Sequence, residues 1–275
     1  MTAKIQSRVY RFAVYAGAFF SIAMLLLIVG YILIKGIPHL TPELFAWEYN
    51  SNNVSMMPSI INTLLMTMIS LIACVPLGIG AAIYLTEYAK RGSRLIKIIR
   101  MTAETLSGIP SIIYGLFGSL FFVVALKMGL SLISGALTLS IMVLPTIMRT
   151  TEEALLAVSD SYREGSFGLG AGRLRTTFKV VLPSAVPGIL SGVILAVGRI
   201  VGETAALIYT AGTVAKVPDS VLDSTRTLAV HMYTISSEGL YINQSYATAV
   251  VLLVVVLGIN GLSFFIAKRI GRSHT

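Results

Sequence analysis

The sequence predicts an all-α integral membrane protein with six membrane-spanning helices. Of its 275 residues, 55% are hydrophobic and only 12% are charged, and the mean hydropathy is +0.83. A water-soluble domain cannot bury that much apolar surface, so the composition favours a membrane protein. The net charge of +9 does not indicate nucleic-acid binding, because the basic residues cluster in short segments beside apolar runs.

Six apolar runs are long enough to cross a bilayer, which needs about 20 residues. The first run follows a basic leader and lacks a small-residue cleavage site, so we interpret it as a retained anchor and not as a signal peptide. The predicted spans are residues 12–34, 58–85, 101–126, 130–148, 188–211 and 246–267. The second span carries a polar stripe and is expected inside the bundle; the stripe is Asn62, Thr63, Thr67 and Ser70.

The distribution of lysine and arginine predicts which side each segment faces. Sixteen of these residues lie in the leader, in segments 87–100 and 149–187 and in the C-terminal tail, whereas four lie in the opposite loops. Cytoplasmic loops carry the excess of basic residues. Both termini and segment 149–187 are therefore predicted to be cytoplasmic, in a multi-pass protein of a bacterial-type plasma membrane.

The longest cytoplasmic segment contains a polar, glycine-punctuated stretch, SYREGSFGLGAGRLRTTFKVVLPSAVPG at residues 161–188. Ser161 and Glu164 have the spacing of a capping box, which predicts a helix start. Glycines interrupt that helix and a second short helix follows, which Pro183 and Pro187 are expected to end or bend. A hairpin of this kind at a membrane surface is typical of a docking site for another protein.

This stretch resembles the cytoplasmic loop of binding-protein-dependent ABC importer permeases, whose pattern is E-A-A, three residues, G, nine residues, I-x-L-P. Here it reads Glu164-Gly165-Ser166, three residues, Gly170, nine residues and Val180-Val181-Leu182-Pro183. The resemblance implies a type I ABC importer permease fold, in which this loop is the coupling helix that sits in a groove of the ATPase subunit. The coupling residues that it implies are Tyr162, Arg163, Glu164, Gly165, Ser166, Gly170, Leu182 and Pro183.

Three stretches resemble the permeases of the high-affinity phosphate ABC importer, with the PstA-type subunit the nearest match. They are IPSIIYGLFG at 109–118, YREGSFGLGA at 162–171 and GRIVGETAAL at 198–207, where relatives often have Pro in place of Ala206. The resemblance, from about Ser59 to Lys268, implies a second homologous permease, two ATP-binding subunits and an extracytoplasmic phosphate-binding protein as partners. A permease for sulfate, molybdate or tungstate is the alternative, because the chemistry of an oxyanion site is the same.

Two ionisable residues, Arg199 and Glu203, fall inside the fifth predicted span. Charged side chains at membrane depth usually face a bundle interior, and residues four apart share a helix face, so we expect an ion pair. A guanidinium stays charged and can bind two oxygens of phosphate. We therefore expect Arg199 on the substrate path, held by Glu203, with Thr204 as a further donor; a pair that only fixes helix packing is the other interpretation.

The third predicted span contains residues that interrupt helices: Gly108, Pro110, Gly115 and Gly118. A broken helix at membrane depth is tolerated where it is buried in protein or lines a wet path. The resemblance implies that Ser111 and Tyr114 line the translocation path. A simple proline kink is the alternative.

We do not expect an enzyme. The sequence has no G-x-x-x-x-G-K-[ST] loop, so ATP hydrolysis is expected in a partner subunit, and no metal or other cofactor is expected. A sensor of phosphate status would use the same surfaces and stays open. The predicted organisation is an anchor span and outer loop at 1–57, a permease core at 58–268 with the cytoplasmic coupling loop at 149–187, and a tail at 269–275. The outer loop 212–245 is expected to meet the binding protein.

Overall fold

The computed structural model describes residues 2–90 and 92–272, so Arg91 and the last three residues of the predicted tail lie outside the described residues. Every regular element in these ranges is a helix. Five helices are long and apolar enough to cross a membrane, and a bent pair of helices provides a sixth crossing if it is counted as one broken span. The predicted all-helical membrane protein with six apolar segments is confirmed.

The elements follow each other with short connections, except for the longer segments 46–56 and 211–227. They are α1 (Thr2–Gly36), η1 (Ile37–His39), η2 (Pro42–Phe45), α2 (Met57–Ile83), the π-helix η3 (Tyr84–Tyr88), α3 (Arg94–Ser107), α4 (Ser111–Gly118), the π-helix η4 (Ser119–Ala125), α5 (Leu132–Leu156), α6 (Asp160–Gly168), α7 (Arg173–Thr176), the π-helix η5 (Thr177–Val181), α8 (Leu182–Val201), α9 (Ala205–Thr210), α10 (Leu228–Ser237) and α11 (Ile242–Arg272). The segment 212–245, predicted as a loop, thus contains the helix α10.

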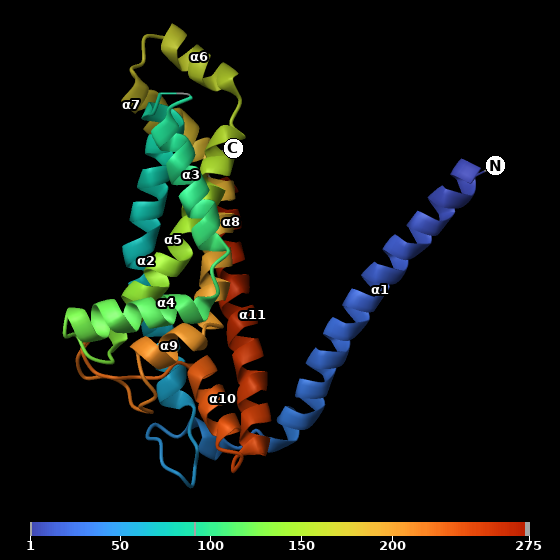
Figure 1. Ribbon diagram of the computed structural model, residues 1–275, viewed down its shortest axis with the longest axis vertical. Coiled ribbons are helices and arrows are strands. Elements are labelled where there is room, and N and C mark those ends of the chain that lie inside the picture. Colours follow the sequence, from blue (N-terminus) through green and yellow to red (C-terminus); the bar gives the residue numbers. More distant parts are fainter. Residues whose placement is uncertain (1, 91, 273–275) are drawn as a thin grey trace.

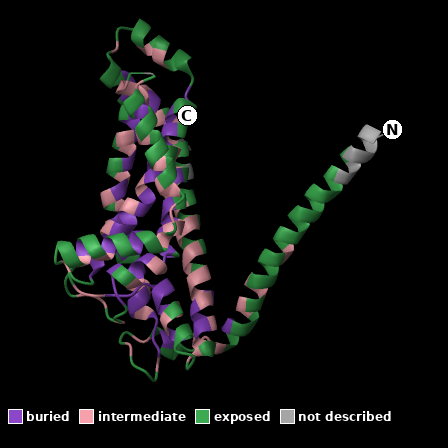
Figure 2. Cartoon of the chain, viewed as in Figure 1, coloured by how far each residue is buried: buried purple, intermediate pink, exposed green. Residues whose placement is uncertain are grey.

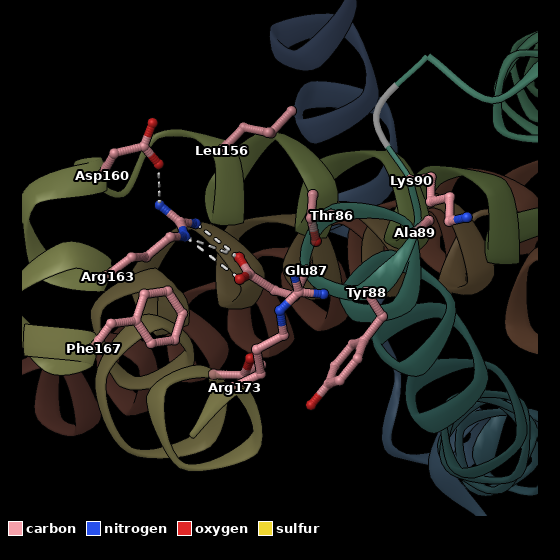
Figure 3. A pocket seen from close by; sticks show the side chains of 11 residues that line it. Thr86, Glu87, Tyr88, Ala89, Lys90, Leu156, Asp160, Arg163, Phe167 and Arg173 are labelled. Atoms are coloured by element: carbon pink, nitrogen blue, oxygen red, sulfur yellow. Dashed lines mark hydrogen bonds and ion pairs between the residues drawn. The ribbon is translucent and has the colours of Figure 1, made fainter. Parts of the chain in front are cut away.

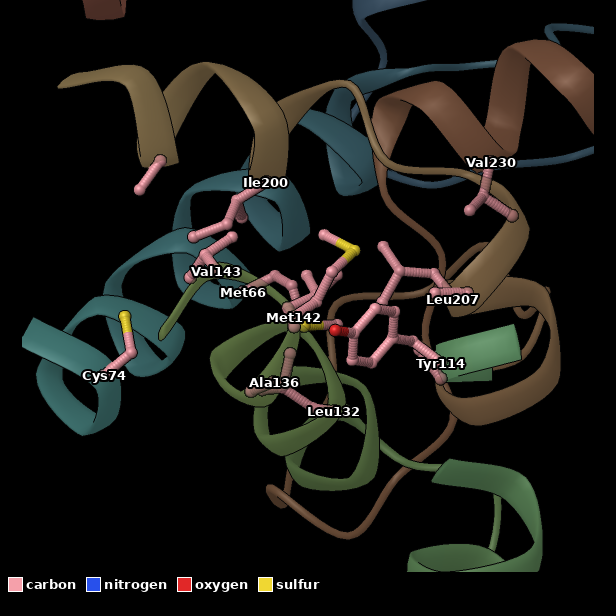
Figure 4. Close-up of a cluster of buried hydrophobic side chains, with 14 of the residues drawn as sticks. Met66, Cys74, Tyr114, Leu132, Ala136, Met142, Val143, Ile200, Leu207 and Val230 are labelled. Carbon is pink, nitrogen blue, oxygen red and sulfur yellow. The ribbon is translucent and has the colours of Figure 1, made fainter. Parts of the chain in front are cut away.

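Helix α5 forms the centre of the bundle, where it packs against α2 and α8, and α8 packs in turn against α11 (Figure 1). Met142 and Leu207 belong to the main apolar core, and the ring of Tyr114 also lies in it (Figure 4). The predicted polar stripe of α2 is buried, which confirms its expected place inside the bundle. Asn62 Nδ2, for example, donates to the carbonyl of Lys216 at 2.9 Å.

Helix α1 is the exception to this packing. No residue of its apolar window is buried, and the helix leans away from the bundle (Figures 1 and 2). It touches α11 only near its own C-terminal end, where Gly36 lies against the backbone of Tyr246. The N-terminal end of α1 and the C-terminal end of α11 lie at the same end of the molecule as α6 (Figure 1).

Pro183 and Pro187 were predicted to end or bend the helix that contains them, and they do not end it. Residues 173–201 form one continuous helix of 29 residues, built from α7, η5 and α8. In the π-helix η5 the N–H of Leu182 donates to the carbonyl of Thr177, five residues back. This wider turn carries the chain to Pro183, at the start of α8, without needing the N–H that proline lacks.

Two predicted spans are broken in the middle. The third changes direction by 102° between α3 and α4, at Gly108–Pro110, and it begins earlier than predicted, at Arg94. Gly115 and Gly118 were also predicted to interrupt the helix, but α4 contains both of them. A Cβ at Gly115 would lie 2.7 Å from Cα of Ala206, so this glycine allows α4 to approach α9 closely.

The fifth predicted span does not continue to residue 211. Helix α8 ends at Val201, and the short helix α9 starts at Ala205, after three intervening residues. Helices α4 and α9 each follow a break, and they pack against each other (Figure 1). The two breaks therefore place non-helical backbone within the apolar segments.

Candidate functional site

The hairpin at the end of the bundle is built from α6 and α7. Its cap differs from the prediction: Ser159, not Ser161, is the N-cap residue, and its hydroxyl accepts from the N–H of Ser161, so no capping box with Glu164 forms. Gly170 has a φ of +82°, a left-handed conformation that confirms the turn expected there. The Ser166 hydroxyl bonds to that of Thr176 at 2.8 Å, which joins α6 to α7.

Arg163 fastens α6 to the rest of the molecule. Its side chain is 14% exposed and its Nη2 lies 2.8 Å from Oε1 of Glu87, whose side chain is 10% exposed (Figure 3). The same guanidinium donates to the carbonyl of Leu155 in the last turn of α5 at 2.9 Å, to that of Val158 just after α5 at 2.7 Å, and to Asp160. Arg163 is therefore occupied within this chain.

The other predicted coupling residues fall into two groups. Tyr162, Glu164 and Gly165 are exposed on α6, and Glu164 forms no ion pair with a described residue. Leu182 and Pro183 are half-buried at the start of α8, where Leu182 packs on the apolar cluster at this end of the bundle. The exposed face of α6, with the C-cap residue Leu169 at 91% exposure, is the part of the hairpin that is free to meet another protein.

Arg199 lines a groove of about 860 Å³ between α5, α8 and α11. Glycines on α8 bring its neighbour close: a Cβ at Gly188 would lie 2.6 Å from Cβ of Ala154, and one at Gly192 would overlap Thr150. Arg199 is half-buried and forms no ion pair with any carboxylate of the described residues. The groove thus contains an uncompensated cation.

The predicted ion pair between Arg199 and Glu203 is absent among the described contacts, because the two residues do not share one helix. Glu203 lies in the break after α8, is 8% exposed, and its Oε1 accepts from the N–H of Ala206 at 3.1 Å. A carboxylate at the first turn of a helix stabilises the unpaired N–H groups and the positive end of the helix dipole. Glu203 is therefore the capping group of α9.

The remaining predicted path residues lie at the two breaks. Tyr114 is 5% exposed, and its hydroxyl donates to the carbonyl of Leu106 at 2.8 Å, which bridges the bend between α3 and α4. Ser111 is the half-buried first residue of α4, and Thr204 is the half-buried residue before α9. Whether these residues line a substrate path stays a prediction.

No role was assigned from the sequence to two polar residues, Glu87 and Asn260. Glu87, the partner of Arg163, was taken as the start of a loop, and no local pattern links two residues 76 positions apart. Asn260 lines the groove opposite α8. The sequence could have indicated this residue, because it is a polar amide inside the apolar sixth span.

Comparison with solved structures identifies the fold. A bacterial alginate ABC transporter, in complex with an alginate-bound periplasmic protein, matches with a TM-score of 0.63 at 17% identity and covers 92% of this chain and 95% of that chain. The MetNI methionine ABC transporter, in an inward-facing conformation, matches with a TM-score of 0.59 at 21% identity, over 80% and 94%. The helical arrangement of this chain, with its hairpin at one end, is therefore the fold of the membrane subunits in these two ABC transporters.

Sequence comparison identifies the family. The chain belongs to the binding-protein-dependent transport system inner membrane components, whose family profile matches residues 74–273. It is 33% identical over 233 residues to the probable ABC transporter permease protein YqgI of Bacillus subtilis, covering 79% of each chain. It is 32% identical over 213 residues to the phosphate transport system permease protein PstA of Mycobacterium leprae, covering 75% of this chain and 69% of that one. The chain is therefore a multi-pass membrane protein of a transport system.

Proposed function

We propose that the chain is a permease subunit of an ATP-driven importer of inorganic phosphate and that it forms the translocation path with a second, homologous permease. The observation that carries the proposal is the uncompensated Arg199 in a groove between α5, α8 and α11, in a chain whose relatives include proteins named as phosphate transport permeases. Sulfate, molybdate and tungstate are not favoured by any relative described above.

The chemistry of Arg199 suits a phosphate path. The guanidinium keeps its charge at any physiological pH and presents N–H groups in a planar fork that matches two oxygens of a tetrahedral anion. Because Glu203 caps α9, it does not neutralise Arg199, so the guanidinium is free for an anion. A single cation in an open groove also keeps binding weak enough for release, as transport requires.

We place ATP hydrolysis in two partner subunits that dock on the hairpin. The exposed face of α6, with Tyr162 and Glu164, supplies a surface that a partner can bind. Arg163 anchors α6 to the bundle through its ion pair with Glu87. The basic residues on this side of the bundle support a cytoplasmic orientation of the hairpin and both termini, in a plasma membrane.

The second permease and the binding protein are supported by surfaces at other places on the chain. Helix α1 has no buried residue in its apolar window, and α4 with η4 exposes an apolar face that includes Leu116 and Leu120. Such faces pack against another membrane protein or against lipid. The segment 212–245 lies at the end of the bundle opposite the hairpin, where we expect the phosphate-binding protein (Figure 1).

The test is uptake of labelled phosphate into proteoliposomes that contain the full complex. We expect Arg199→Ala to lower uptake at least tenfold while the complex still assembles, because an ionic hydrogen bond contributes about 1.5 to 3 kcal/mol. Arg94→Ala removes an exposed arginine of α3, outside both the groove and the hairpin, and is the matched control for loss of one positive charge. Sulfate and molybdate are measured in parallel. Normal phosphate uptake by Arg199→Ala, or uptake of another oxyanion in place of phosphate by the unmodified complex, would contradict the proposal.

A further inference from the structure

A second polar side chain lines the groove that contains Arg199. Asn260 lies inside α11, and it is the residue by which α11 contributes to this groove. A Cβ at Gly198 would lie 3.7 Å from both Nδ2 and Oδ1 of Asn260. The amide of Asn260 therefore lies against the backbone of Gly198, the residue that precedes Arg199.

The orientation of this amide indicates which of its two polar atoms is available to the groove. Its Oδ1 atom is buried and has no hydrogen-bond partner among the described residues. A polar amide within a membrane helix is normally retained because it bonds to a neighbouring helix. Since the oxygen of Asn260 is shielded, the Nδ2 group is the part of the amide that is available to the groove.

The geometry points to Asn260 as a second anion-binding residue, which forms with Arg199 a site for a tetrahedral oxyanion between α8 and α11. Arg199 supplies a charged donor and Asn260 Nδ2 a neutral one, so the pair fixes the position of the anion without adding a second charge. This inference rests on the proposed function and adds a ligand to the same path.

The other charged groups of the groove do not compete for this role. Glu153 of α5 lines the groove, but its Oε1 lies 3.0 Å from Nε of Arg149, which also faces Glu104 at 3.8 Å. The carboxylate of Glu153 is thus paired away from Arg199. An anion meets unbalanced positive charge only at the part of the groove where Arg199 and Asn260 lie.

The test measures maximal uptake of labelled phosphate by the full complex in proteoliposomes. We expect Asn260→Ala to lower the rate about tenfold, as for loss of a hydrogen bond to a charged group. Asn260→Asp keeps the size of the side chain; we expect a larger loss at pH 7 than for Asn260→Ala, because an aspartate beside Arg199 stays ionised, cannot donate and repels the anion. Leu262→Ala, at a position 61% exposed on the same helix, is the control and should leave the rate unchanged.

Three results would overturn the inference. They are unchanged uptake by Asn260→Ala, uptake by Asn260→Asp at pH 7 equal to that of the unmodified complex, and loss of a bound phospholipid from native mass spectra of Asn260→Ala with uptake intact. The last would assign the groove to a lipid headgroup. If the unmodified complex carries another oxyanion and not phosphate, the proposed function fails. Uptake by the Asn260 variants is then measured with that anion.

Discussion

At the scale of single residues, Arg163 shows how a motif position can serve the chain that contains it. The family pattern placed Arg163 on the docking surface, whereas in the structure its guanidinium binds Glu87 and two carbonyls at the C-terminal end of α5. Its neighbours Tyr162 and Glu164 stay exposed. The hairpin thus has an outward face for a partner and an inward arginine that sets the position of α6.

Replacement of Arg163 should destabilise the cytoplasmic end of the bundle. Arg163→Ala leaves the carboxylate of Glu87 largely buried and unpaired, and loss of one partner of such a pair costs about 3 to 5 kcal/mol. Thermal unfolding in detergent should show a clearly lower Tm than for the unmodified chain, and Arg163→Lys should lie between the two because it keeps the charge but not the fork. Arg175→Ala serves as control. Equal Tm values for Arg163→Ala and the control would rule out this role.

His231 should make stability depend on pH. It is fully buried beside Tyr49; burial and then the charge of Arg226 lower the pKa of His231 to about 3. Since this is below the usual value of about 6.5, the neutral imidazole is favoured in the folded state. The contribution of the neutral imidazole to the free energy of unfolding is fully present above about pH 6.5. It is lost at about 1.4 kcal/mol per pH unit as the pH falls towards 3.

The measurement is the Tm in detergent between pH 7 and pH 4.5. His231→Leu should show a shallower loss of Tm on acidification than the unmodified chain, because no imidazole has to stay neutral in the folded state. His39→Gln removes a histidine that is only half-buried and should keep the full slope. Parallel slopes for the unmodified chain and His231→Leu would refute the prediction.

At the scale of elements, the two broken spans depend on contacts that are far apart in sequence. The bend at Gly108–Pro110 has a local signal, a glycine followed by a proline, and was predicted as an interruption. The end of α8 at Val201 has only a weak one, since Gly202 alone does not distinguish a break from a close helix contact. The break is explained by two contacts in the structure: Glu203 caps α9, and α9 packs on α4.

The contact between α4 and α9 should be sensitive to a single methyl group. A Cβ at Gly115 meets Cα of Ala206 at 2.7 Å and the carbonyl of Ala205 at 3.3 Å, and backbone atoms cannot rotate away. We expect Gly115→Ala to destabilise the chain by about 1 to 3 kcal/mol, as overpacked cores do, and to reduce uptake.

A matched glycine makes this test specific. Gly80 lies inside α2 with no atom within 4 Å of its added Cβ, so Gly80→Ala should be neutral or stabilise by up to about 1 kcal/mol, because alanine favours helix. Tm values of the two variants are compared in the same detergent. A Tm of Gly115→Ala at or above that of Gly80→Ala would show that the two helices can separate without cost.

At the scale of the whole molecule, composition and charge distribution predicted most of the architecture. The apolar runs correspond to long helices or to the bent pair, and the polar stripe of α2 is buried as expected. The sequence could not show the unpacked position of α1, because a lipid-facing helix and a partner-facing helix have the same composition. Nor could it show that Arg163 meets Glu87, since that contact exists only once η3 and α6 lie side by side.

The unbroken helix from Arg173 to Val201 has a mechanical consequence. One end lies in the hairpin, and Arg199 lies near the other, 26 residues further on, a length of about 39 Å at 1.5 Å per residue. A stiff rod of that length turns a tilt of about 5° at the hairpin into a displacement of roughly 3 Å at Arg199. That distance is about one hydrogen-bond length, so a tilt this small is enough to carry the guanidinium into or out of reach of an anion held by the other helices.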